Sequence, residues 1–202
     1  MNRFPRFLPA LAAALLLTFS ACDSNDPGDD GGGGEEEVIS NVDMVLTPQN
    51  GSAFTVAAVF DESGVLQSRE TVNLTAGTVY SVEVNFRNRF EDDPEELDEE
   101  IKVEENIAHQ LFVIPEGGVA DDLTISDRNT DDAGQPLGTS FTLAVGDEAD
   151  TGDLRVVLRH YEGDTDELVI EQKGDDLDLT TAEVPGVVEN DVNFTFPVSI
   201  SG

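Results

Sequence analysis

The feature that most constrains the fold of this chain is an alternation of apolar and polar residues that recurs from residue 42 to residue 200. Successive side chains of a β-strand point to opposite faces, so this period of two places one face on a core and the other in water. Such one-sided burial is typical of antiparallel sheets. The pattern predicts long strands at 42–46, 54–60, 80–86, 141–145, 154–158 and 192–200, and shorter ones at 65–74, 111–114, 123–126 and 168–171.

Turn-forming residues separate nearly all of these runs, as in Pro48-Gln49-Asn50-Gly51 and Asp61-Glu62-Ser63-Gly64. Roughly nine short strands with this spacing predict an all-β fold, a single antiparallel β-sandwich of immunoglobulin or fibronectin type over residues 38–202. The chain has no tryptophan, and its one cysteine lies near the N-terminus. We therefore expect apolar side chains, without a disulfide, to hold the two sheets together.

Residues 94–109 are compatible with two structures. Asp93-Pro94-Glu95-Glu96 offers a cap, a proline at the first helical position and acids in the first turn, which is typical of a helix start. The alternation of Ile101, Val103 and Ile107 would instead suit an extended edge strand. We favour a short acidic helix or turn that leads into a strand at Gln110.

Cys22 directly follows an apolar stretch at residues 8–19, and Arg3 and Arg6 precede that stretch. This is the layout of a secretory signal. The segment resembles a bacterial lipoprotein signal, which implies that residues 1–21 are removed and that Cys22 is lipidated on sulfur. The resemblance implies a protein of the cell envelope, lipid-anchored to the outer or inner membrane and facing the periplasm or the cell surface. An ordinary cleaved signal and an uncleaved membrane anchor are the alternatives.

Residues 22–37 form an acidic, glycine-rich segment that contains four consecutive glycines, Gly31 to Gly34. Almost nothing in this segment can be buried to offset the entropy of ordering, so we expect a disordered tether. Asp23, directly after the cysteine, agrees both with retention in the inner membrane and with surface display. The sequence therefore does not choose the leaflet.

The chain carries 43 acidic residues against 10 lysines and arginines, a formal net charge of −33. Such a field repels phosphate backbones, so nucleic acid is not expected as a partner. An acid-rich, lysine-poor composition is typical of halophilic adaptation, in which counterions screen the self-repulsion. A dedicated cation-binding surface is the alternative.

The segment Glu99–Phe112 resembles a Glu-Ile…Glu…His-Gln-Phe-Phe segment of small bacterial envelope lipoproteins. These proteins carry the label "type 1 periplasmic binding fold superfamily", and their function is unknown. The resemblance implies an envelope location, but the chain has neither the length nor the helices for two α/β lobes, so the sandwich remains the expected fold. Shorter matching motifs lie at Val45–Pro48, Gly134–Gly138, Leu158–His160 and Asn193–Phe196.

One candidate site is the loop in which Asp127, Asn129 and Asp131 place oxygen atoms at every second position before a glycine, as calcium loops do. The EF-hand spacing is met only in part, because Gly138 stands where a bidentate glutamate belongs and Asp132 replaces the turn glycine. The loop is therefore interpreted either as a weak calcium site or, as we favour, as a solvated acidic loop.

A second candidate site uses His109 and His160, the two histidines of the chain, with Glu104, Glu105 and Glu162 close in sequence. If the two strands adjoin, two imidazoles and a carboxylate provide a ligand set for zinc or another transition metal. Both histidines stand at positions of their predicted strands that alternate with polar residues and are expected to face the core. The alternative is therefore a pair of hydrogen-bonded residues at the core or its rim.

No nucleophile motif, phosphate loop or dinucleotide fingerprint occurs in the sequence, so no catalytic residues are assigned and an enzyme is not expected. The sequence predicts a membrane-anchored, non-enzymatic interaction or structural module without an obligatory cofactor. Its partner would be an unidentified protein or glycan. The alternatives are a calcium- or metal-dependent binding module and a hydrolase with unrecognised carboxylates.

Overall fold

The computed structural model describes residues 38–90, 97–161, 173 and 188–202. The predicted signal at 1–21, the tether at 22–37 and the strand at 168–171 lie outside these residues. Within the described ranges, no helix has both the length and the apolar character needed to cross a membrane.

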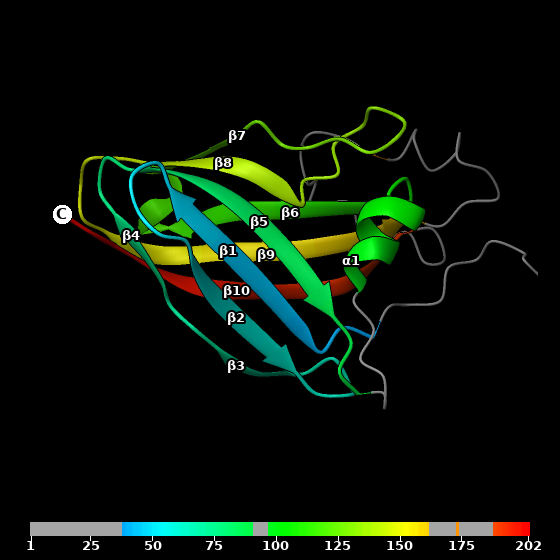
Figure 1. Cartoon of the computed structure of the whole chain (residues 1–202). Coiled ribbons are helices and arrows are strands. Elements are labelled where there is room, and N and C mark those ends of the chain that lie inside the picture. Colours follow the sequence, from blue (N-terminus) through cyan, green and yellow to red (C-terminus); the bar gives the residue numbers. More distant parts are fainter. Residues whose placement is uncertain (1–37, 91–96, 162–172, 174–187) are drawn as a thin grey trace, which may run out of the picture. The chain divides into compact units, whose positions relative to one another are not determined.

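The described strands form two sheets, and every strand predicted within the described ranges is found (Figure 1). The six-stranded sheet has the order β3 (Leu66–Arg69), β2 (Phe54–Phe60), β1 (Asn41–Pro48), β5 (Val79–Arg87), β8 (Ser140–Val145) and β7 (Leu123–Ser126). The four-stranded sheet has the order β4 (Val72–Thr75), β10 (Val188–Ser201), β9 (Thr151–Tyr161) and β6 (His109–Gly117). A short 3₁₀ helix, η2 (Gly118–Ala120), follows β6.

The apolar positions of both sheets form one buried core, which confirms the predicted all-β sandwich. The rings of Phe60 on β2 and Phe194 on β10 meet edge to face across the two sheets, with centroids 5.2 Å apart. Phe194 in turn meets Phe196, whose side chain is fully buried. Apolar burial of this kind contributes about 25 cal/mol for each Å² removed from water and is the main force joining the sheets.

Residues 65–74, which the alternation predicts as a single strand, contribute one strand to each of the two sheets. Its first half is β3, at the edge of the six-stranded sheet, and its second half is β4, at the edge of the other. No turn intervenes at Glu70 and Thr71, so the direction of β3 carries over to β4. For this reason β4 pairs with β10 in parallel, and the smaller sheet is not purely antiparallel as expected.

The acidic segment before β6 is helical in the described part, as favoured. Helix α1 (Leu97–Glu99) continues into a π-helical turn, η1 (Glu100–Glu104), which buries Leu97 and Ile101. The predicted helix start at residues 93–96 lies outside the described residues. The following strand begins at His109, one residue earlier than predicted.

The start of β6 and the end of β9 lie beside η1, and we call this part of the sandwich the histidine end (Figure 1). Here β6 and β9 pair antiparallel, with His109 directly opposite His160. The first residues of β10 pair with the last residues of β9, so three strands meet at this end.

Phe196→Ala should lower the free energy of unfolding by about 3–5 kcal/mol, because it leaves a cavity where the ring is 0% exposed. Val65→Ala, at a side chain that is 56% exposed, is the control and should change stability by less than about 0.5 kcal/mol. Urea unfolding at constant salt measures both. An equal, small effect of the two changes would contradict the central place of β10 in the core.

Candidate metal centre

The two histidines lie side by side at the histidine end. Their ring centroids are 4.6 Å apart and the ring planes are inclined by 41°. His109 is 0% exposed and His160 is 4% exposed, so both rings belong to the interior. The two histidine-bearing strands therefore adjoin, as the predicted ligand set requires.

The third residue of the cluster, and its carboxylate, is Glu105. This residue lies in the turn between η1 and β6, and its backbone N–H donates to the carbonyl of Glu100, which closes the π-helical turn. One ligand atom from each of Glu105, His109 and His160 lies within 4.8 Å of the others. Of the other glutamates named with the histidines, Glu104 is exposed at the end of η1 and Glu162 lies outside the described residues.

A hydrogen bond to the backbone orients the ring of His109. Its Nδ1 lies 3.0 Å from the carbonyl oxygen of Glu105. Since a carbonyl only accepts, Nδ1 donates, and the opposite ring nitrogen, Nε2, faces the carboxylate of Asp191 at 3.8 Å. A backbone carbonyl on the second nitrogen of a metal-binding histidine is a common arrangement, because it fixes both the tautomer and the ring orientation.

The donor set suits a borderline divalent ion such as zinc better than calcium, which prefers six to eight oxygen atoms. Donor atoms of a tetrahedral zinc site lie about 3.3 Å apart, as follows from bond lengths of about 2.0–2.1 Å. In this structure the three ligand atoms lie within 4.8 Å of one another, a limit wider than that spacing. A bound zinc ion would require the three donor atoms to lie closer together than this limit.

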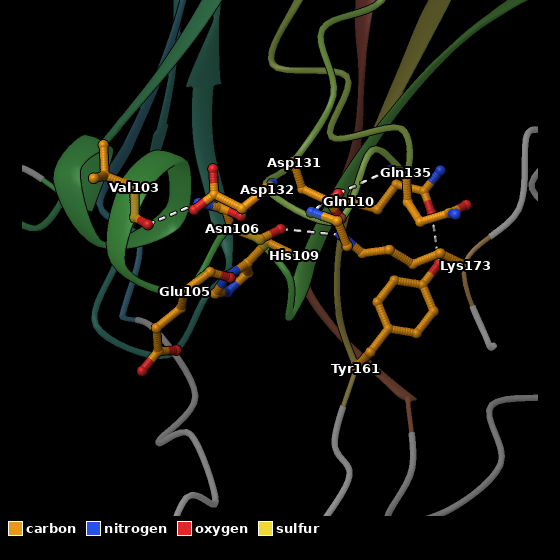
Figure 2. A network of polar contacts seen from close by, with 11 residues as sticks. Val103, Glu105, Asn106, His109, Gln110, Asp131, Asp132, Gln135, Tyr161 and Lys173 are labelled. Atoms are coloured by element: carbon orange, nitrogen blue, oxygen red, sulfur yellow. Dashed lines mark hydrogen bonds and ion pairs between the residues drawn. The ribbon is translucent and has the colours of Figure 1, made fainter. Parts of the chain in front are cut away.

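A network of polar contacts holds the turn that carries Glu105 (Figure 2). The side-chain amide of Asn106 donates to the carbonyl of Val103 at 2.7 Å, and its oxygen accepts from the backbone N–H of Asp132 at 3.0 Å. The backbone carbonyl of Asn106 accepts from the ammonium of Lys173, also at 3.0 Å. The turn is thereby tied both to the loop after β7 and to Lys173.

Lys173 and Asp131 form a buried ion pair. Nζ lies 2.6 Å from Oδ2, and both side chains are 0% exposed. The other carboxylate oxygen of Asp131 accepts from the backbone N–H groups of Ala133 and Gln135. Burial lowers the pKa of Lys173, and the hydrogen bond and negative charge of Asp131 oppose that shift only in part.

In the predicted calcium loop, the oxygen atoms of Asp127, Asn129 and Asp131 contact other groups of the protein. Asp131 binds Lys173, and the side-chain oxygen of Asn129 accepts from the backbone N–H of Ser140 at 2.9 Å. Asp127 is exposed, has a positive φ of 52° and accepts from the hydroxyl of Ser126. The favoured interpretation as a solvated loop is wrong for Asp131, which is 7% exposed, because Lys173 neutralises it inside the protein. Calcium binding stays a prediction.

Sequence reasoning missed Lys173 and Asp191. Lys173 is one of only two lysines in a very acidic chain, and that rarity was the available signal. Nothing in the sequence pairs it with Asp131, 42 residues earlier. Asp191 directly precedes the alternating residues of β10, and no pattern distinguishes it from the many other aspartates.

Compared with known proteins, the chain matches no protein family, no curated protein and no solved structure. The resemblance to small envelope lipoproteins therefore stays a prediction that rests on short motifs.

Lys173→Met should lower the free energy of unfolding by about 3–5 kcal/mol, because it leaves the carboxylate of Asp131 buried without its cation. Lys102→Met is the matched control. Lys102 is 17% exposed, pairs with the more exposed Glu83 and Asp98 and donates to the amide oxygen of Asn85, so its loss leaves partners that water can reach and should cost less, about 1 kcal/mol.

Adding Asp131→Asn to the Lys173→Met variant should recover part of the loss, because an amide needs no counter-charge. Urea unfolding of the four proteins at one salt concentration measures these differences. If Lys173→Met were no more destabilising than Lys102→Met, the buried ion pair would have no structural role.

Proposed function

We propose that this chain is a membrane-anchored, non-enzymatic envelope protein whose β-sandwich binds a divalent transition metal ion through Glu105, His109 and His160. The observation that carries the proposal is the register of β6 and β9, which sets the two histidines of the chain directly opposite each other beside a carboxylate. Two histidines distributed at random over a chain of this length would rarely meet in this way.

Electrostatics support a cation at this position. The chain has a net charge of −33, so its field draws cations toward the domain. Two imidazoles and a carboxylate together provide lone pairs for an ion, and a divalent ion would compensate the negative charge of the half-buried Glu105. Zinc is the ion we select for testing, because it accepts nitrogen and oxygen donors in a small tetrahedral site.

The burial of the site favours binding over catalysis. A catalytic metal keeps one coordination position open to water or substrate. His109 and His160 are both buried, so their nitrogens face the interior of the domain. We therefore propose a metal that stabilises or shapes the domain, as in a metal-dependent binding module.

The proposed location rests on the predicted signal at residues 1–21 and on Cys22, which follows it. Lipidation there would hold the domain at a membrane of the envelope on the acidic tether of residues 22–37. An unidentified protein or glycan of the envelope is the partner class that such a location offers. The metal would then keep one end of the sandwich in a fixed shape for that partner.

Zinc should bind the untagged full-length chain with about 1:1 stoichiometry in isothermal titration after chelator treatment. It should also raise thermal stability, by about 2.7 kcal/mol when the free ion is 100 times its dissociation constant. His109→Ala and His160→Ala should each abolish the effect, because each removes an imidazole ligand.

Glu105→Gln and Glu104→Gln form the matched pair for this titration, since the two glutamates are neighbours and only Glu105 belongs to the cluster. Glu105→Gln should weaken zinc binding at least about tenfold, a typical minimum for a residue that supports a metal, and Glu104→Gln should not. Calcium, with ionic strength matched by sodium chloride, tests the loop at Asp127. The proposal fails if wild-type protein does not bind zinc, or if the two glutamate variants behave alike.

A further inference from the structure

The amine of Lys173 and the carboxyl group of Asp131 are held in contact inside the protein (Figure 2). Nζ of Lys173 lies 2.6 Å from Oδ2 of Asp131 and donates to the carbonyl of Asn106 at 3.0 Å. Both side chains of the pair are 0% exposed. Two groups fixed in contact react as if each were present at a very high concentration, about 10⁵–10⁸ M for well-oriented pairs. This pair has the proximity that a covalent bond requires.

The second carboxylate oxygen of Asp131 faces two backbone donors. Oδ1 accepts from the N–H of Ala133 at 3.0 Å and from that of Gln135 at 2.8 Å. Two N–H groups at about 2.7–3.1 Å from one oxygen are the arrangement that stabilises the negative oxygen of a tetrahedral acyl-transfer intermediate. Backbone hydrogen bonds of Asp131 with Gly134 and Gln135 hold the loop in this shape, so the donors are in place before any reaction.

Burial favours the uncharged forms of the pair. It lowers the pKa of Lys173, and the hydrogen bond and the charge of Asp131 oppose this shift only in part. A proton that moves from Nζ to Oδ2 leaves a nucleophilic amine beside a carboxylic acid, which is a better electrophile than a carboxylate. Two buried charges carry a large desolvation cost, whereas an amide between the same groups carries no charge.

We infer that Lys173 and Asp131 condense to an isopeptide bond, so that the buried ion pair is the reactant state of a covalent cross-link. The amine lone pair attacks Cγ of Asp131, and the negative charge passes to Oδ1 between its two N–H donors. Oδ2, which has already taken one proton from Nζ, takes a second proton from Nζ and leaves as water. The Nζ–Cγ bond forms and the Cγ–Oδ2 bond breaks, and the step consumes no oxidant, reductant or co-reactant.

The cross-link would fasten two distant parts of the chain. Lys173 and Asp131 are 42 residues apart, and the bond would join the loop after β7 to the segment between β9 and β10. A cross-link stabilises a fold mainly by restricting the unfolded chain. The single cysteine of the chain, Cys22, lies outside the predicted sandwich domain and so provides no disulfide within it. The inference goes beyond the proposed metal site and does not depend on it.

The first test is tryptic mapping of the denatured full-length wild-type chain by mass spectrometry. Trypsin cleaves after arginine and lysine but not after an acylated lysine. Residues 129–155 should therefore stay joined to residues 160–202 in one branched peptide that is lighter than its two parts by one water. Cleavage after Lys173 into separate linear peptides overturns the inference, as does a branch that fragmentation places on an acid other than Asp131.

Lys173→Arg and Lys102→Arg are the matched variants. Both keep a cation at the changed position, but a guanidinium does not attack the carboxyl group. Lys173→Arg should give only linear peptides, and Lys102→Arg should still give the branched one. A branched peptide at the same place in Lys173→Arg overturns the inference. Since the wild-type map alone detects the bond, the test does not rely on the folding of a variant. Zinc titration is read separately, so loss of the cross-link leaves the proposed metal site standing.

Discussion

The interaction on which the histidine end depends is the antiparallel pairing of β9 with its two neighbours. Side chains alternate along a strand, so a slip of one residue between β6 and β9 would move His109 or His160 to the opposite face of the sheet. The buried stripe of Leu154, Val156 and Leu158 prevents such a slip, because it would expose three leucine and valine side chains to water. Core packing thus determines the register, and the register determines which polar groups meet.

Charge balance explains why this end contains so many specific contacts. In a chain with 43 acids, a buried carboxylate has to meet a cation or several hydrogen-bond donors, since an isolated buried charge is very costly. Asp131 meets both in Lys173 and the backbone N–H groups of the loop. The half-buried Glu105 lies beside the two imidazoles, and the proposed metal would supply a positive charge there. Lys173 places its ammonium at the carbonyl of Asn106, and the proposed metal would place a second cation next to the same turn.

The sequence predicted the strands and the buried positions of both histidines, because these follow from a local period of two. It left open whether β6 and β9 adjoin, since pairing depends on the packing of distant segments. The helix before β6 was favoured correctly, since Leu97 and Ile101 lie four residues apart on one helical face. The register shift of β10 between Asn190 and Val192 and the ion pair of Lys173 were not predicted, because both arise from tertiary contacts that no local pattern records.

The loop that resembles a calcium site contributes to the metal centre in another way. Asp131 and Asp132 of this loop hold Lys173 and the side chain of Asn106, and Asn106 is the residue next to Glu105. Because Glu105 supplies a carboxylate and also the carbonyl that orients His109, the position of its backbone sets two features of the centre at once. A shift of the loop would move Asn106 and, through it, Glu105. The acidic loop and the histidines therefore form one structural unit, in which the lysine ammonium fixes the turn that a metal ion would use.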